Sequence, residues 1–204
     1  MPRKQVHISI NKALDYGWKA TSHYIGFYLT LVLLILLFNL VPSVFETLFD
    51  NSIYTPVVRG IFVVLIAIVT LGIIRTTLKH VDHKDTSLLD LFRLNLFGRY
   101  IATAFIYLFM LIGGFMLLII PGVYWGIKYQ FATYLVVDKR LEIAQAFEES
   151  ARIVAGHEWD LLSYWLVMFL LNLAGILFFT VGIVVTLPVT LIGYSYIYRQ
   201  LRQA

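Results

Sequence analysis

The sequence contains no cysteine and has few charged residues. Without cysteine the chain forms no disulfide, offers no thiolate to a metal and has no cysteine nucleophile. Only 14% of the residues are charged and 60% are hydrophobic, against about 25% and about 45–50% in a soluble domain. A soluble fold is not expected, because the longest apolar stretches would have no side that faces water.

Sequence motifs of the common enzyme classes are also missing. There is no Gly-x-Ser-x-Gly, no His-Glu-x-x-His, no phosphate-binding glycine loop and no dinucleotide-binding fingerprint. One cluster has metal-ligand chemistry, but zinc needs three or four convergent ligands and the spacing does not fix that convergence. We therefore expect no enzyme, no metal and no cofactor, with a metal-dependent intramembrane enzyme as an alternative. The cluster consists of His80, Asp82, His83 and Asp85.

The hydrophobic residues gather into runs of roughly 18–22 residues, the length that crosses about 30 Å of hydrocarbon at about 1.5 Å per residue. We predict one integral membrane domain over residues 1–204, an all-α polytopic bundle of about six transmembrane helices. The fourth run is short and carries Lys128 and Gln130, so it is either a span or a re-entrant segment. The predicted spans are residues 24–41, 57–79, 100–120, 122–137, 161–180 and 183–199.

Three amphipathic segments alternate with these runs, at residues 1–22, 88–97 and 141–154. With an even number of spans, both termini lie on one side of the membrane. That side receives almost all of the lysines and arginines, whereas the other receives only Arg59. Basic residues favour the cytoplasmic side. We therefore expect both termini and all three amphipathic helices in the cytoplasm.

A repeat of amphipathic segment, span, turn and span organises the chain in three units. Pro121-x4-Gly126 in the second unit corresponds to Pro188-x4-Gly193 in the third, and aromatic residues follow each. The first and third units share a weaker pattern. We predict three hairpin-like repeats; the alternative is that unrelated hydrophobic hairpins look alike. The weaker pattern pairs Ala13-Leu-Asp-x-Gly-x-Lys19 with Ala146-Phe-Glu-x-Ser-x-Arg152.

Residues 119–160 carry a longer motif, which starts at Pro121-Gly-Val-Tyr and ends at Gly156-His-Glu-Trp159. It resembles a prokaryotic family of uncharacterised six-span integral membrane proteins related to the membrane domain of glycerophosphodiester phosphodiesterases. In that family an arginine is usual where this chain has Lys128, and a small residue is common at Gln130. The resemblance implies a multi-pass protein of the cytoplasmic (inner) membrane. It does not imply phosphodiesterase activity, because the sequence has no soluble phosphodiesterase domain.

Lys128 is the residue whose position most needs a functional explanation. It lies seven residues past Pro121, roughly 10 Å along a helix, and a charge near the bilayer centre costs at least about 2.5–3.5 kcal/mol. We predict that Lys128, Tyr124, Tyr129 and Gln130 line a polar cavity for an anionic ligand. The alternative is that Lys128 reaches the membrane surface or pairs with a buried acid. Asp138 is about 15 Å away on a straight helix.

These observations favour a non-enzymatic membrane protein that binds or moves a lipid-like or amphiphilic ligand. The alternative is an accessory subunit that docks a membrane or cytoplasmic protein through the amphipathic face of 141–154. Membrane lipids are the expected partners, since the basic residues follow the membrane edge and attract anionic lipids. Nucleic-acid binding is not expected.

Overall fold

The computed structural model describes residues 8–49, 54–84, 95–177 and 182–203, and these residues form helices joined by short turns, with no strand among them. The predicted all-α class is therefore confirmed. Four of the described helices are long and apolar enough to cross a membrane, and they coincide with predicted spans 24–41, 57–79, 100–120 and 161–180. They are α2 (Ile25–Leu48), α3 (Thr55–Val81), α4 (Phe97–Leu117) and α8 (Glu158–Leu177).

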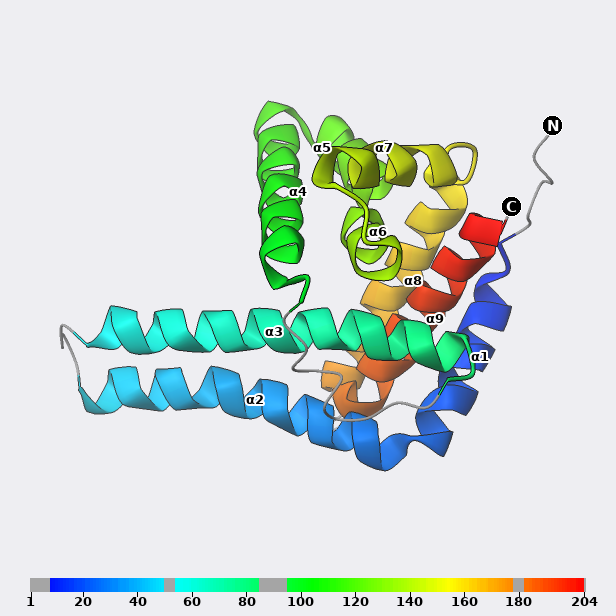
Figure 1. Cartoon of the computed structure of the whole chain (residues 1–204). Helices are drawn as coiled ribbons and strands as arrows, with labels where there is room; N and C mark the ends of the chain where they lie inside the picture. The colour runs from blue at the N-terminus through cyan, green and yellow to red at the C-terminus, as the bar shows by residue number, and fades with distance from the viewer. Residues whose placement is uncertain (1–7, 50–53, 85–94, 178–181, 204) are drawn as a thin grey trace.

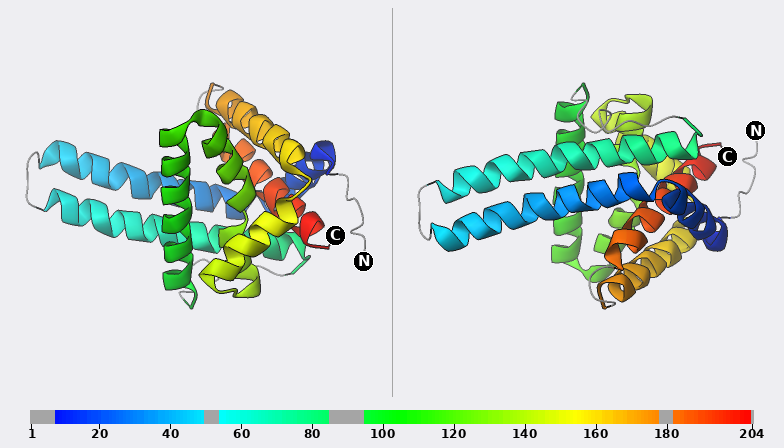
Figure 2. Two further views of the ribbon diagram at one scale, coloured as in Figure 1. Left: turned by 90° about the horizontal axis from the view of Figure 1, so that it is seen from above. Right: turned by 90° about the horizontal axis from the view of Figure 1, so that it is seen from below.

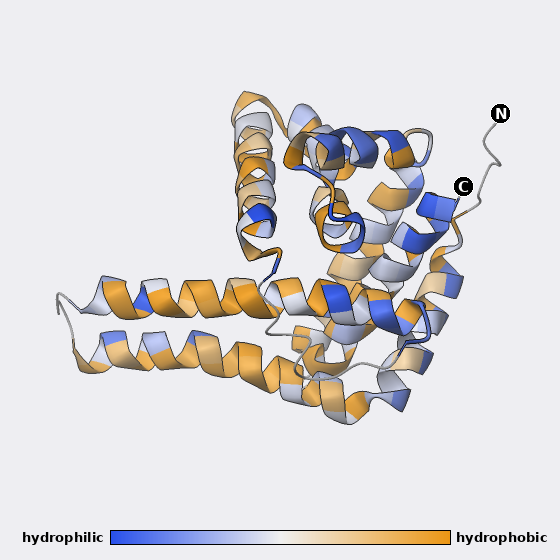
Figure 3. Ribbon diagram, viewed as in Figure 1, coloured by the Kyte–Doolittle hydropathy of each residue, from blue (hydrophilic) through white to orange (hydrophobic). Residues whose placement is uncertain are grey.

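These four helices are mainly hydrophobic (Figure 3), and many of their apolar side chains are exposed. Only 17–28% of the residues in their most apolar stretches are buried within the protein. Leu40 on α2 and Phe109 on α4, for example, are 61% and 68% exposed. A helix that is hydrophobic all round needs an apolar environment on every side. The exposed surface is thus compatible with a membrane protein.

The prolines of α2 and α3 occupy different positions in their helices. Pro56 stands in the first turn of α3, where its missing N–H is not needed by the helix. Pro42, which we expected to end the first span, lies inside α2 instead, and the helix continues to Leu48. The residues after Pro42 are still mostly apolar, and the proline itself is buried.

The predicted span 122–137 is two helices, α5 (Ile119–Tyr129) and α6 (Ala132–Lys139). Ser150 holds the break between them from another part of the chain. Its hydroxyl donates to the Lys128 carbonyl oxygen at 3.1 Å and accepts from the Phe131 amide at 3.1 Å. Both backbone groups lie at the interruption of the helix, where they would otherwise be unpaired. Neither helix is long enough to cross the bilayer alone.

The sixth predicted span, 183–199, lies within α9 (Ile183–Gln203), which is not among the four candidate spans. Its C-terminal half is polar and aromatic, with Tyr194, Ser195 and Arg199, and most of that half is buried. The helix packs against α1, α3 and α8. α9 therefore serves as a central helix of the fold rather than as a lipid-facing one.

Two of the three predicted amphipathic helices are present, α1 (Ile10–His23) and α7 (Ile143–Val154). The Ser9 hydroxyl caps α1 by accepting from the Lys12 amide at 3.4 Å. α1 packs along α9, and α7 packs on α5 and α6. Most of the third predicted helix, 88–97, falls on 85–94, outside the described residues; α4 begins at Phe97.

Consecutive helices form hairpins: α2 with α3, α4 with α5, and α8 with α9. Two orientations show the α2–α3 hairpin reaching away from the other helices, while α4 runs across it (Figures 1 and 2). The first and last described helices, α1 and α9, lie side by side (Figure 1). The other helices gather around α9 and the end of α3 that lies next to it, and a cavity of ligand size is found there.

Two glycines allow α4 and α5 to pack closely against each other. A Cβ atom on Gly114 would lie 2.8 Å from the Gly122 Cα, and one on Gly122 would lie 2.7 Å from the ring of Phe115. The turn itself is at Leu118, which has an extended backbone between the two helices. The chain therefore reverses three residues before Pro121, which sits in the first turn of α5.

Candidate ligand site

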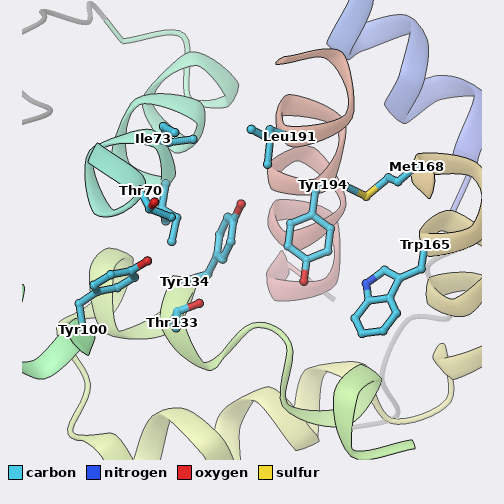
Figure 4. A pocket seen from close by; sticks show the side chains of 10 residues that line it. Thr70, Ile73, Tyr100, Thr133, Tyr134, Trp165, Met168, Leu191 and Tyr194 are labelled. Atoms are coloured by element: carbon cyan, nitrogen blue, oxygen red, sulfur yellow. The ribbon is translucent and has the colours of Figure 1, made fainter. Parts of the chain in front are cut away.

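A cavity of about 510 Å³ opens among five helices. Its volume falls in the range of about 300–1,000 Å³ that is typical of small-molecule sites. We call it the tyrosine cleft, and Figure 4 shows its lining side chains converging from α3, α4, α6, α8 and α9. The lining residues are Thr70, Ile73, Ile74, Tyr100, Thr133, Tyr134, Trp165, Met168, Leu191 and Tyr194.

Aromatic packing fixes the floor of the tyrosine cleft. The ring of Tyr134 lies 5.3 Å from that of Tyr194 and 5.4 Å from that of Tyr198, and Phe131 lies 4.9 Å from Tyr194. The Ser195 hydroxyl sits next to Tyr134 at 3.5 Å. Edge-to-face and tilted aromatic pairs at such spacings stabilise a packed core. The short helix α6 is thereby held against α9.

The Tyr100 hydroxyl has no hydrogen-bond partner among the described residues, although Tyr100 is only 6% exposed. Figure 4 shows the hydroxyl directed towards the interior of the cleft. The Thr133 hydroxyl, on the neighbouring helix, also has no partner within the described part of the chain. These two hydroxyls therefore offer a ligand hydrogen bonds that the protein does not make itself.

Gln130 is the one predicted site residue that contacts lining residues of this cleft, although it does not line the cleft itself. Its side-chain oxygen accepts from the Trp165 indole N–H and from the Tyr194 hydroxyl, each at 2.8 Å. Its side-chain nitrogen donates to the Ile127 carbonyl oxygen at 2.9 Å. Gln130 is buried behind the two aromatic side chains and orients both. A small residue at this position would leave Trp165 and Tyr194 without their shared acceptor.

The other three predicted site residues form a separate group on α5. The Lys128 ammonium donates to the Tyr124 hydroxyl at 3.4 Å and lies 5.2 Å and 5.7 Å from the ring centres of Tyr124 and Tyr129. These are cation–π distances. The structure thus brings Lys128, Tyr124 and Tyr129 together, but Gln130 turns away from them towards α8 and α9. Lys128 is not among the residues that line the tyrosine cleft.

Asp138 does not serve as a partner for Lys128, because it belongs to an ion-pair cluster at the end of α6. The Arg199 guanidinium donates to Asp138 and to Asp82 at 2.7 Å each. Arg202 and the Tyr198 hydroxyl also donate to Asp138, the latter at 2.9 Å. Arg199 and Asp138 side chains are only 10% and 12% exposed. The cluster therefore ties the ends of α3, α6 and α9 together.

A second cavity, of about 230 Å³, lies beside this cluster. We call it the basic pocket, since five of its lining side chains are basic and two are acidic. The sequence does not predict this pocket, although Asp82 was a possible metal ligand, because its residues come from four separate stretches of the chain. The lining residues are Arg75, Leu78, Lys79, Asp82, Lys84, Asn95, Leu96, Val137, Asp138, Arg140 and Arg199.

Two of the possible metal ligands, His80 and Asp82, make other contacts instead. The His80 ring is hydrogen-bonded to the Tyr28 hydroxyl and stacked on Tyr24, with ring centres 4.4 Å apart, while Asp82 is bonded to Arg199. The described residues contain no group of three potential ligands arranged for a metal, and Asp85 lies outside them. The Tyr16 hydroxyl donates to the His80 carbonyl oxygen at 3.0 Å. Burial raises the pKa of Tyr16, which keeps this donor protonated.

Comparison with known proteins identifies distant bacterial relatives. Uncharacterized protein Mb2590 of Mycobacterium bovis and uncharacterized proteins MT2637 and Rv2560 of Mycobacterium tuberculosis are each 27% identical to the chain over 130 residues, or 64% of it. The aligned region covers 40% of each relative, so the chain matches about two fifths of their length. No protein-family model matches the chain, and no solved structure matches it. The relation to the membrane domain of glycerophosphodiester phosphodiesterases therefore stays an expectation from the motif at 119–160.

Proposed function

We propose that this protein binds a lipid-like amphiphile in the tyrosine cleft and holds or moves it without changing it chemically. The observation that carries the proposal is the Tyr100 hydroxyl, which has no hydrogen-bond partner among the described residues and borders an otherwise mainly apolar cleft. Around it stand apolar side chains such as Ile73, Met168 and Leu191. A ligand that matches this lining has an apolar body and a hydrogen-bond acceptor.

The position of the cleft supports a ligand that comes from the bilayer. Three of its walls, α3, α4 and α8, are candidate spans, and their other sides expose apolar residues. Thr70, at the margin of the cleft, is exposed rather than buried. An amphiphile dissolved in the membrane could therefore reach the cleft without crossing water.

We also propose that the chain contributes six membrane-embedded segments as three related hairpin units, with both termini in the cytoplasm of a bacterial cell. The contacts of the amphipathic helices support the relation between the units. Phe147 on α7 lies 5.6 Å from Tyr129, and Tyr16 on α1 lies 4.8 Å from Tyr196. Tyr129 and Tyr196 occupy the same place, eight residues after Pro121 and Pro188.

The amphipathic helix α7 supports an accessory role less well. Its apolar face packs on α5 and α6, with Ala146 and Ile153 buried. A partner protein would therefore meet the charged face, which carries Glu148. A docking role and a ligand site at Lys128 are the two alternatives to ligand binding in the tyrosine cleft. The experiment described next separates these alternatives from the cleft.

The test is native mass spectrometry of the detergent-purified protein titrated with phosphatidylcholine, a neutral amphiphile. Leu191→Trp fills the cleft and is expected to abolish the tight lipid adduct. Tyr100→Phe removes one hydrogen bond worth about 0.5–1.5 kcal/mol, so the dissociation constant should rise about twofold to tenfold. Leu166→Trp, at a site on α8 that is 58% exposed, is the matched control and should bind as the wild type does.

Lys128→Met tests the alternative ligand site at Lys128. If the ligand occupies the tyrosine cleft, this variant keeps the tight adduct, since Lys128 lies outside the lining. Loss of the adduct in Lys128→Met with an unchanged adduct in Leu191→Trp would refute the cleft and favour the Lys128 site. Equal binding by all variants would refute a specific amphiphile site of either kind.

A further inference from the structure

The tyrosine cleft is rich in aromatic side chains. Four of its ten lining residues are aromatic, whereas aromatic residues make up 16% of the whole chain. They come from four different helices, α4, α6, α8 and α9, and Figure 4 shows them arranged around one space. The composition of the chain alone does not produce this local concentration. The four residues are Tyr100, Tyr134, Trp165 and Tyr194.

The polar atoms of two of these aromatic side chains are already engaged by the protein. The Trp165 indole N–H and the Tyr194 hydroxyl both donate to the side-chain oxygen of Gln130 at 2.8 Å, and Gln130 does not line the cleft. These two residues therefore offer a ligand their ring surfaces rather than a hydrogen-bond donor. Donation to the shared acceptor also shifts electron density towards both rings. The ring of Tyr134 meets that of Tyr194 at 75° with centres 5.3 Å apart, so the two rings form adjacent walls of a corner.

None of the ten described lining residues carries a charge, which restricts the ionic groups that the cleft accepts. An anionic group would find no cation there and would face aromatic rings, whose faces are negative. A primary ammonium has three N–H donors, but no carboxylate of the described lining accepts them. A quaternary ammonium group has no N–H to satisfy, and aromatic faces attract it. The lining therefore suits this class of cation.

We infer that the amphiphile of the tyrosine cleft carries a quaternary ammonium group, and that the aromatic side chains of the cleft bind this group through cation–π contacts. The inference rests on the proposed function. The Tyr100 and Thr133 hydroxyls also accommodate the cation, because a hydroxyl oxygen can turn its lone pairs towards a positive charge. The apolar body of the ligand lies against side chains such as Ile73 and Leu191. A neutral amphiphile fills the same cleft but leaves the aromatic faces without a cation.

The test compares two probes with the same decyl chain, decyltrimethylammonium and the uncharged decyldimethylphosphine oxide, whose oxygen accepts hydrogen bonds. Both are titrated by native mass spectrometry in a neutral detergent. The wild type is expected to bind the cation about tenfold more tightly or better, and Trp165→Leu should reduce that preference about fivefold. Trp165→Phe loses the same hydrogen bond to Gln130 but keeps an aromatic ring, so it should retain most of the preference. Binding of the phosphine oxide close to that of the wild type shows that the variants are folded.

Trp159→Leu is the matched control, because Trp159 lies on the same helix, is 78% exposed and does not line the cleft. It should leave the preference intact. Equal affinity of the wild type for the two probes would overturn the cation inference and leave the proposed amphiphile site standing, provided that Leu191→Trp weakens both. A preference that Trp165→Leu and Trp165→Phe reduce equally, or that only Trp159→Leu reduces, would also overturn the inference. If Leu191→Trp affects neither probe, the proposed function itself fails.

A competition experiment identifies the source of the quaternary ammonium group. Phosphatidylcholine carries this group, and phosphatidylglycerol with the same acyl chains does not. Displacement of decyltrimethylammonium by phosphatidylcholine alone supports the inference with a lipid headgroup as the source. Displacement by neither lipid supports it with a free amphiphilic cation as the source, whereas displacement by both lipids equally would count against recognition of the cation.

Discussion

Asp138→Asn tests whether the Arg199 cluster stabilises the fold. In the native protein, Asp138 accepts hydrogen bonds from Arg199, Arg202 and the Tyr198 hydroxyl, and its side chain is 12% exposed. The substitution keeps the shape but removes the charge that faces Arg199. Breaking a buried ion pair costs about 3–5 kcal/mol when one charge is left uncompensated. Because Asp82 still faces Arg199 at 2.7 Å, we expect a loss near the lower limit, about 3 kcal/mol.

The measurement is a double-mutant cycle. Asp138→Asn, Arg199→Gln and the combined variant are unfolded in detergent micelles, and the free energies of unfolding are compared. We expect a coupling energy of about 2–3 kcal/mol, since both side chains are about one-tenth exposed. The matched control is the cycle for Arg59 and Glu46, whose side chains are 67% and 30% exposed. An exposed pair of this kind contributes less than about 1 kcal/mol. Equal coupling in the two cycles would refute the reasoning.

Two further substitutions test how the helices are joined. Ser150→Ala leaves the Lys128 carbonyl and the Phe131 amide unpaired at the break between α5 and α6, and should cost about 1–3 kcal/mol of unfolding free energy; Ser163→Ala, at an exposed serine on α8, should change it by less than about 0.5 kcal/mol, and equal losses would contradict the role of Ser150. Gly193→Ala places a Cβ atom 2.3 Å from the Tyr164 hydroxyl and 2.9 Å from the Ala13 carbonyl oxygen, so thermal unfolding should show a loss of about 1–3 kcal/mol. Gly113→Ala, with open space around the site, should be neutral or stabilising, and a loss as large as that of Gly193→Ala would show that contact at Gly193 is not the cause.

The helices themselves could be predicted from hydropathy, because apolar runs of membrane length leave few alternatives. Two departures from the predicted helices stand out, and the first depends on a distant residue. The segment 122–137 looks continuous in sequence, yet it breaks where Ser150, 19 residues beyond Phe131, satisfies the backbone. Pro42 looks like a stop, yet α2 passes through it. Local patterns contain no information on such partners.

The candidate site was harder to predict, for a similar reason. Lys128 attracted attention because it is a lone charge in an apolar run, but its contacts are with Tyr124 and Tyr129. Gln130, which we expected beside Lys128 in a polar cavity, instead hydrogen-bonds to side chains 35 and 64 residues away. The Arg199 guanidinium meets Asp82 across 117 residues. Convergence of that kind depends on the tertiary fold, and hydropathy and spacing do not predict it.

The most direct measurement of the central claim is site-specific photo-crosslinking in native bacterial membranes. A benzoylphenylalanine at position 168, in place of Met168 in the tyrosine cleft, should cross-link one lipid class that is enriched relative to its share of the membrane. The same group in place of Leu166, on the exposed side of α8, should cross-link lipids in proportion to the membrane composition. A ligand in the cleft predicts this difference between the two positions. Cross-linked lipids of identical composition at both positions, or none at position 168, would contradict it.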